Sequence, residues 1–225
     1  MNIADAAKII CGAAIGAGCK CICNVLAAGL LKNRGFGFNE KKAERAILFA
    51  VMAVSGGMIM WLTPGAESIY MFLLLSCLEV LSVTDLHERV IPNSAVGALF
   101  AITLLFGIPG MAGVNTFPEF KPLPALAGMV MCFVIFMLPA LMSKKVGAGD
   151  VKLAAAAGFC LGIRLSLVCI VLMGVFVLAF TVLQNKLPLL KSFKTMIPMG
   201  PFLSGAMMTV MILVNISSVR AMLAF

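Results

Sequence analysis

The chain has 225 residues, of which 62% are hydrophobic and 12% charged, and it carries a formal net charge of +8 at pH 7. So few polar groups cannot cover a water-soluble globule of this size, which excludes that class. The Lys and Arg residues fall between apolar runs and form no continuous basic face, which favours contact with membrane lipid over nucleic acid. We therefore predict a single integral-membrane domain, residues 1–225, that binds no nucleic acid.

The chain contains several apolar runs, each near the roughly 20 residues that a helix needs to cross a bilayer. They lack the alternation of apolar and polar residues that is typical of barrel strands. The predicted fold is all-α, a polytopic membrane helical bundle with eight transmembrane helices, or seven if the short sixth run does not cross. Gly162 and Arg164 mark a break after that run. The predicted spans are Ile9–Leu31, Ala46–Leu62, Ser68–Thr84, Pro92–Ile108, Pro124–Met142, Val151–Leu161, Leu165–Gln184 and Ile197–Ile216.

The first run contains a lysine, Lys20, among apolar residues. A lysine at membrane depth either snorkels to the headgroups or pairs with an acid inside the bundle, and Glu79 in the third run is a candidate partner. The sequence leaves both interpretations open. The eight cysteines include no CxxC pair, so we expect them to pack as small apolar side chains and predict no metal site.

Basic residues are distributed unequally between the two sides of the predicted bundle. With the N-terminus outside, the inner side holds Lys32, Arg34, Lys41, Lys42, Arg45, Arg89, Lys144, Lys145, Lys152, Lys186, Lys191 and Lys194. The outer loops and the C-terminal tail hold Lys121, Arg164 and Arg220. Because short cytoplasmic loops carry the excess of positive charge, Asp85 and Asp150 are both predicted at the cytoplasmic face.

These two aspartates lie near the cytoplasmic ends of apolar runs, Asp85 in TDLHERVIPN and Asp150 in GAGDVKL. A carboxylate facing hydrocarbon costs about 2.5 kcal/mol or more, so such acids line a wet cavity or meet a partner. Gly147 and Gly149 permit tight backbone geometry, and Asp150 falls at or near a helix N-cap. Each motif alone also fits an ordinary capping or loop acid. Together, two carboxyl groups can share one proton and activate a water for peptide hydrolysis.

Two further residues near the aspartates have competing interpretations. His87 is the chain's one histidine, and we interpret it as a loop or interface residue, with tuning of Asp85 as the weaker alternative. Lys152, two residues after Asp150, either helps to hold the active-site loop or faces lipid headgroups.

Three segments occur in order along the chain, TDLHERVIPN, GAGDVKLAAAAG and IPMGPFL. Together they resemble the signatures of the type IV prepilin peptidases, and GAAIGAGCKCICN in the first run is loosely similar to that family's first span. The resemblance implies an aspartic endopeptidase of the cytoplasmic membrane, its active site facing the cytoplasm. Its substrates would be prepilins or pseudopilins with a basic leader and an apolar helix. It implies catalytic Asp85 and Asp150, an active-site loop with Gly147, Gly149 and Lys152, and no cofactor.

The segment Lys32–Arg45 departs from the longer members of that family, because it is too short to be their cysteine-paired cytoplasmic insertion. We therefore expect a short-form peptidase without N-methylation activity or an S-adenosylmethionine site. One alternative is an intramembrane protease similar to signal peptide peptidase or presenilin, although Thr84 replaces the tyrosine that usually precedes the first aspartate. Another is a proton-coupled transporter or small channel that uses Asp85, Asp150 and Glu79.

Overall fold

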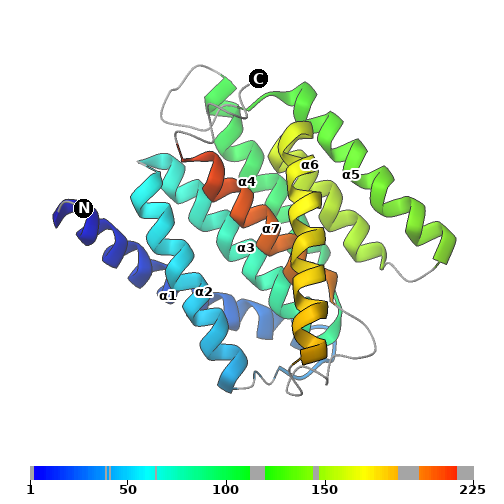
Figure 1. Ribbon diagram of the computed structural model, residues 1–225, viewed down its shortest axis with the longest axis horizontal. Coiled ribbons are helices and arrows are strands. Elements are labelled where there is room, and N and C mark those ends of the chain that lie inside the picture. The colour runs from blue at the N-terminus through cyan, green and yellow to red at the C-terminus, as the bar shows by residue number, and fades with distance from the viewer. Residues whose placement is uncertain are drawn as a thin grey trace.

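The computed structural model of the protein describes residues 3–38, 40, 42–63, 65–111, 120–143, 147–186 and 198–216. Within these ranges the fold is all-α and has seven helices (Figure 1). They are α1 (Ile3–Lys32), α2 (Lys42–Leu62), α3 (Ala66–Glu88), α4 (Asn93–Met111), α5 (Pro122–Ser143), α6 (Ala148–Lys186) and α7 (Met199–Val214). Six of them are long and apolar enough to cross a membrane, and α7 is a shorter apolar helix. The prediction of a polytopic helical membrane protein is confirmed.

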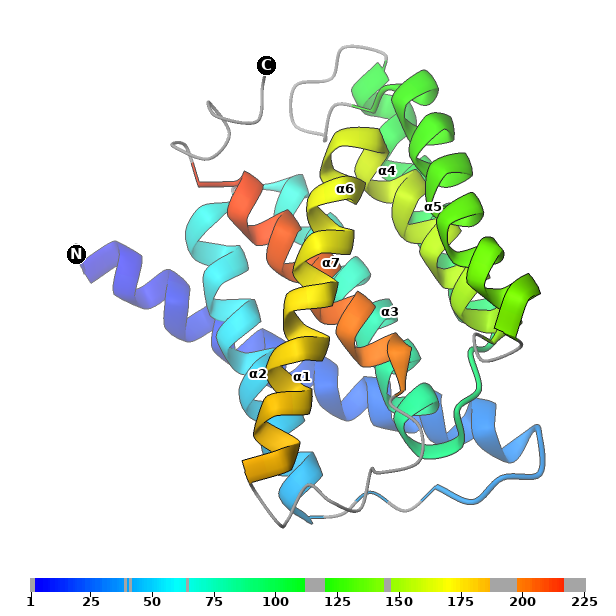
Figure 2. The ribbon, with the colours of Figure 1, turned by 45° about the vertical axis from the view of Figure 1, so that its right-hand side comes forward.

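Helix α6 reverses its direction at Gly162, whose backbone angles are φ 72 and ψ 172. The first arm, residues 148–161, and the second arm, residues 163–186, form a V (Figures 1 and 2). Glycine permits the turn because side-chain-bearing residues rarely adopt a positive φ. The hydroxyl of Ser166 donates to the carbonyl of Gly162 at 2.6 Å and so supports the turn. The predicted break is confirmed, and the sixth and seventh predicted spans are the two arms of this V.

Two helix boundaries near the site differ from the sequence-based expectation. Helix α3 continues to Glu88, whereas the span was predicted to end at Thr84, so Asp85 lies inside the last turns of a helix. Helix α4 begins at Asn93, and Pro92 precedes it instead of occupying its first turn. The connection between α3 and α4 is therefore short, and it holds the two helix ends together beside Asp85.

Close helix packing in this bundle depends on glycines at two crossings. At the crossing of α1 and α2, a Cβ added to Gly16 would lie 2.2 Å from the carbonyl oxygen of Met52. At the crossing of α5 and the first arm of α6, a Cβ on Gly128 would lie 2.4 Å from the carbonyl oxygen of Gly158. Membrane helices associate through van der Waals packing because lipid is as apolar as their side chains, so small residues stabilise such contacts.

One end of the bundle gathers the helix termini that carry the candidate site. The C-terminal end of α3 and the N-terminal ends of α6 and α7 lie at the lower end of the views in Figures 1 and 2. Helix α7 contacts both α3 and α6, and α4 contacts both of them as well. Leu81, Leu153 and Met207 are almost fully buried where α3, α6 and α7 pack. This packing fixes the relative positions of the three helix ends.

Candidate active site

Asp85 is buried near the C-terminal end of α3, with 5% of its surface exposed. The backbone N–H of Gly200 donates to its Oδ2 at 2.8 Å. Gly200 is the second residue of α7, and the first N–H groups of a helix have no partner within the helix. A Cβ on Gly200 would lie 2.8 Å from Oδ2 and 2.9 Å from Cβ of Asp85, so a glycine is needed for this contact.

Asp150 is the third residue of α6, close to the predicted N-cap position. The N–H of Gly147 donates to its Oδ2 at 3.2 Å, and the Asp150 N–H donates to the Gly147 carbonyl at 3.0 Å. This reciprocal pair is similar to a capping box and fixes the carboxyl group at the helix start. Its other oxygen, Oδ1, is buried and has no hydrogen-bond partner within the described ranges. Buried acceptors without a donor are rare in proteins and often mark a site for water or a ligand.

The structure brings Asp85 and Asp150 to the same end of the bundle, where their carboxyl groups are close enough to interact electrostatically. One comes from the end of α3 and the other from the start of α6. Each carboxyl group is also held by a backbone N–H, from Gly200 and Gly147 respectively. Two carboxyl groups anchored in this way form an acidic pair at one end of the bundle.

The other predicted loop residues fasten the start of α6 to the connection between α3 and α4. A Cβ on Gly149 would lie 3.0 Å from the Cβ of Ile91, so this glycine permits the close approach of the connection between α3 and α4. Lys152 donates from Nζ to Oδ1 of Asn93 at 3.2 Å. Within the described residues no ion pair links Lys152 to either aspartate. Its contact therefore supports the loop instead of adding charge to the acidic pair.

Lys20 pairs with an acid inside the bundle. Its Nζ lies 2.8 Å from Oε1 of Glu79 and 3.0 Å from Oε1 of Glu40, and the lysine is 1% exposed. Of the two interpretations that the sequence left open, the structure therefore supports pairing with Glu79 over snorkelling. Glu40, which the sequence analysis did not single out, also accepts from Asn24 at 3.0 Å and from Arg45 at 3.1 Å. These contacts fix the connection between α1 and α2 against the helices.

His87 is an interface residue, as predicted, although it lies inside α3 and not in a loop. Its Nε2 is 3.0 Å from Oε1 of Glu44 in α2, and its ring packs on Phe38 with centroids 5.1 Å apart. The described contacts of His87 therefore join α3 to α2 and to the preceding connection. They support the end of α3 that carries Asp85.

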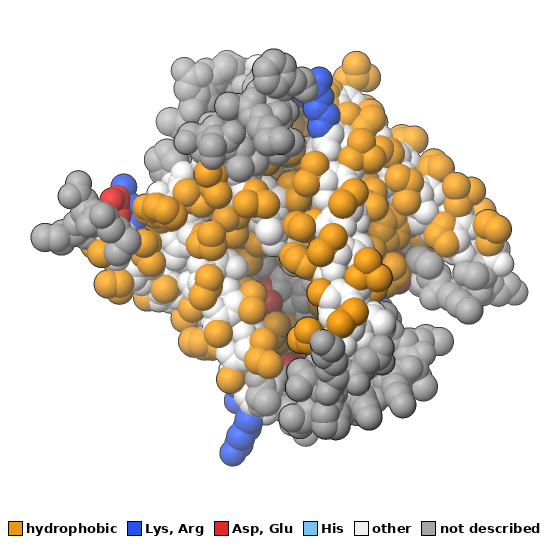
Figure 3. All heavy atoms as spheres, in the orientation of Figure 1, with side chains coloured by type: hydrophobic (Ala, Val, Ile, Leu, Met, Phe, Trp, Pro, Cys, Tyr) orange, Lys and Arg blue, Asp and Glu red, His pale blue; other side chains and the backbone are white. Residues whose placement is uncertain are grey.

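A recess opens in the apolar surface between α2 and the second arm of α6, and acidic side chains are visible at its floor (Figure 3). Over the described residues α2 and α6 make no contact with each other, whereas α7 contacts both. Among the described residues, helix α7 therefore separates these two helices.

Gly200 is a residue of the candidate site that the sequence did not single out. The segment IPMGPFL entered the sequence-based prediction only as the third ordered motif, and Gly200 was not among the predicted site residues. In the structure Pro198 precedes α7 in an extended conformation, and Gly200 contacts Asp85 from the first turn. The signal that pointed to it was the position of this segment as the third ordered motif.

A helical membrane bundle with a pair of anchored carboxyl groups at one end has the features of a membrane aspartic protease. Residues 72–182 match the model of the type IV leader peptidase family, and this segment contains both Asp85 and Asp150. A curated relative, the prepilin leader peptidase/N-methyltransferase of Bacillus subtilis (strain 168), is 31% identical over 125 residues, which are 53% of this chain and 44% of the relative. No solved structure matches the chain.

Residues 72–182 of the chain belong to the type IV leader peptidase family. This confirms the family predicted from the three ordered motifs, and it favours a peptidase over a transporter or channel. The chain spans less than half the length of the curated relative that it matches.

Proposed function

We propose that the protein is an aspartic endopeptidase that removes the leader peptide from prepilin-like proteins at the cytoplasmic face of the cell membrane. The observation that carries the proposal is the interacting pair of Asp85 and Asp150, in which Oδ1 of Asp150 is buried without a donor among the described residues. Membership of the leader peptidase family supports the choice of substrate class.

The proposed reaction uses the two carboxyl groups as a general acid and a general base. One aspartate of the pair is ionised, and it accepts a proton from water while the water oxygen bonds to the scissile carbonyl carbon. The other is neutral and gives its proton to the carbonyl oxygen. The proton taken from water then passes to the nitrogen as the C–N bond breaks, and the second aspartate regains a proton from a hydroxyl group of the collapsing intermediate. The reaction therefore needs no covalent intermediate and no cofactor.

The proposed substrate has a short basic leader in the cytoplasm followed by an apolar helix in the bilayer. The recess between α2 and the second arm of α6 offers such a helix a lateral route toward the carboxyl pair. Cleavage would fall after the glycine that precedes the apolar helix, at the membrane face. Lys32, Arg34, Arg45 and Arg89, at the end that carries the aspartates, support a cytoplasmic orientation of the site.

The curated relative is named as an N-methyltransferase as well as a leader peptidase. We propose that this chain performs the cleavage alone, because the segment between α1 and α2 is short. Prepilin would then be methylated by another enzyme or not at all.

The test is to incubate the purified protein in detergent with a panel of prepilin-like peptides and to measure the mass of each new N-terminus. We expect cleavage at the junction of leader and apolar helix, with no added methyl group. Asp85→Asn and Asp150→Asn should each lower the cleavage rate by about a hundredfold or more, since general acid–base groups contribute about 10²–10⁴-fold.

Asp5→Asn is the matched control, because Asp5 is the chain's remaining aspartate and lies in the first turn of α1. It should cleave at the wild-type rate. Wild-type cleavage by either of the folded Asn variants at positions 85 and 150 would overturn the proposal. Cleavage within the apolar helix of the substrate would instead indicate an intramembrane protease.

A further inference from the structure

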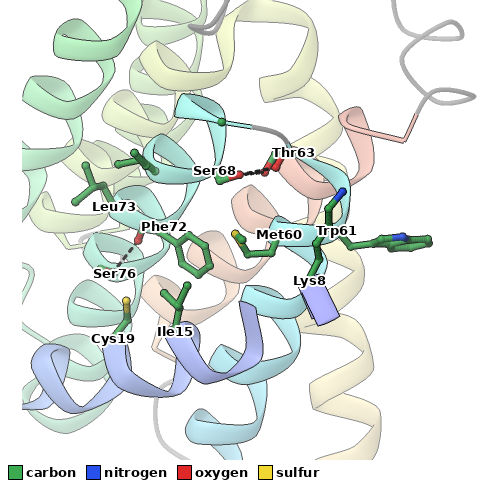
Figure 4. A pocket seen from close by; sticks show the side chains of 12 residues that line it. Lys8, Ile15, Cys19, Met60, Trp61, Thr63, Ser68, Phe72, Leu73 and Ser76 are labelled. Atoms are coloured by element: carbon green, nitrogen blue, oxygen red, sulfur yellow. Dashed lines mark hydrogen bonds between the residues drawn. The ribbon is translucent and has the colours of Figure 1, made fainter. Parts of the chain in front are cut away.

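A cavity of about 850 Å³ lies between α1, α2 and α3, beside the half of α3 that is remote from Asp85 (Figure 4). Its volume is within the range of about 300–1,000 Å³ typical of small-molecule sites. The residues that line it include none of the candidate active site. They include Lys8, Ile15, Trp61, Ser68, Leu73 and Ser76.

The hydroxyl groups of this cavity are satisfied by the protein itself. Thr63 donates to the carbonyl of Ile59 at 2.7 Å, Ser68 donates to the carbonyl of Thr63, and Ser76 donates to the carbonyl of Phe72 at 2.8 Å. Because these donors are already used, the interior offers few polar groups to a ligand. It therefore suits a hydrocarbon chain better than a polar molecule.

The dimensions of the cavity match one leaflet of a bilayer. Its lining runs from Gly65, the residue before α3, along that helix to Ser76, which is about 16 Å at roughly 1.5 Å per helical residue. This is about half of the roughly 30 Å hydrocarbon core of a membrane. Since α3 is a candidate span, the cavity extends inward from the helix end by about the length of one acyl chain.

The mouth of the cavity carries the side chains expected at a lipid headgroup. Lys8 and Trp61 lie beside each other at one end, and the indole ring points away from the cavity (Figure 4). Trp61 is 48% exposed and lies in the last turn of α2, which is the position of the aromatic residues found at membrane interfaces. An ammonium group at this level attracts a phosphate.

We propose that this cavity binds one anionic membrane phospholipid, with an acyl chain along α3 and the phosphate near Lys8. The bilayer itself supplies the ligand. The site is separate from the carboxyl pair and does not depend on the proposed peptidase reaction.

The test is native mass spectrometry of the full chain in detergent, with phosphatidylglycerol or phosphatidylcholine added at equal concentrations. Ile15→Trp and Leu73→Trp fill the cavity from α1 and α3, and both positions are at least 40% exposed. Lys8→Gln removes the cation. We expect the wild type to retain phosphatidylglycerol in preference to phosphatidylcholine. Both tryptophan variants should lose the retained lipid, and Lys8→Gln should reduce the preference about fivefold, since a basic residue near the headgroups is worth about 1 kcal/mol.

Matched controls lie on the same helix outside the cavity. Val25→Trp changes a residue that is 73% exposed, and Lys32→Gln removes a cation at the other end of α1. Both should bind lipid as the wild type does. Retention of phosphatidylglycerol by both cavity-filling variants, or an equal loss of preference in Lys8→Gln and Lys32→Gln, would overturn the proposal. The proposal would also be overturned by a wild type that retains no lipid, or by one that binds a second copy of the chain instead of one lipid per chain.

Discussion

Gly200 has no side chain, and this permits its backbone N–H to approach and hold the carboxyl group of Asp85. Replacing it with alanine places a methyl group 2.8 Å from Oδ2 of Asp85, so the carboxyl group or the start of α7 must move. We expect Gly200→Ala to lower the rate of leader cleavage by about tenfold or more, because a displaced hydrogen bond and a misplaced reacting group each cost this much. The measurement is the cleavage rate of the purified variant, with thermal unfolding measured alongside.

Gly205→Ala is the control for this prediction, since it lies in the same helix and its added Cβ would meet Phe176 at an ordinary distance of 3.8 Å. It should keep both the wild-type rate and the wild-type unfolding temperature. Equal rates for Gly200→Ala and Gly205→Ala would show that the contact with Asp85 does not position the acid.

Glu40 is a buried carboxylate outside the membrane spans, and its charge depends on two cations. Burial raises its pKa, but the hydrogen bonds and charges of Lys20 and Arg45 outweigh burial and bring the pKa below its usual value. A group with a lowered folded pKa stabilises the protein above its unfolded pKa of about 4.3. That contribution is lost as the pH falls through the folded pKa.

We therefore expect Glu40→Gln to lower the free energy of unfolding at pH 7 by roughly 1–3 kcal/mol, the usual loss for hydrogen bonds to a charged group. The difference from the wild type should shrink as the pH falls below about 4. Unfolding in detergent between pH 7 and pH 3 measures it, with Glu67→Gln in the first turn of α3 as the control. A difference that stays constant with pH would show that Glu40 acts by packing and not by its charge.

At the scale of whole helices, glycines at the crossings let the helices pack closely and so hold the bundle together. Gly16 and Gly18 lie two residues apart in α1, but a Cβ on Gly16 would meet the Met52 carbonyl at 2.2 Å, whereas one on Gly18 meets nothing within 4 Å. We expect Gly16→Ala to force α1 and α2 apart and to cost about 1–3 kcal/mol of stability, the usual cost of overpacking. Gly18→Ala should be neutral or slightly stabilising. Thermal unfolding of the two variants in the same detergent tests this, and equal unfolding temperatures would contradict it.

The helices themselves could be predicted from local patterns, and the contacts between them could not. The apolar runs and the break at Gly162 follow from the cost of exposing backbone groups to lipid. The cost of burying a charge left pairing of Lys20 with Glu79 as one of two interpretations, and the sequence did not decide between them. The contact of Gly200 with Asp85 joins residues 115 positions apart. It depends on the register in which α7 packs against α3, and that register cannot be predicted from the sequence of a single chain. Glu40 was missed for the same reason, because nothing local distinguishes a solvated loop acid from one buried against a distant lysine.

For the molecule as a whole, the distribution of positive charge indicates how the bundle is oriented in the membrane. Lys32, Arg34, Arg45 and Arg89 lie at the end that holds the carboxyl pair, whereas Lys121 and Arg164 flank the opposite end. Positive charge in short loops marks the cytoplasmic side of a membrane protein. The carboxyl pair would then meet a substrate whose leader has not crossed the membrane.

A membrane-impermeant amine reagent labels exposed lysines, so it reports which end of the bundle is accessible from each side of the membrane. Lys32, at the end of α1, and Lys121, just before α5, are both exposed. In inside-out vesicles we expect labelling of Lys32 and none of Lys121. Vesicles of the opposite orientation should show the reverse pattern, with Lys121 as the internal control on the same chain. Labelling of Lys32 in right-side-out vesicles would place the carboxyl pair outside the cell. The basic leader of a prepilin could not reach the site from the cytoplasm in that case, and the proposed reaction would lose its substrate.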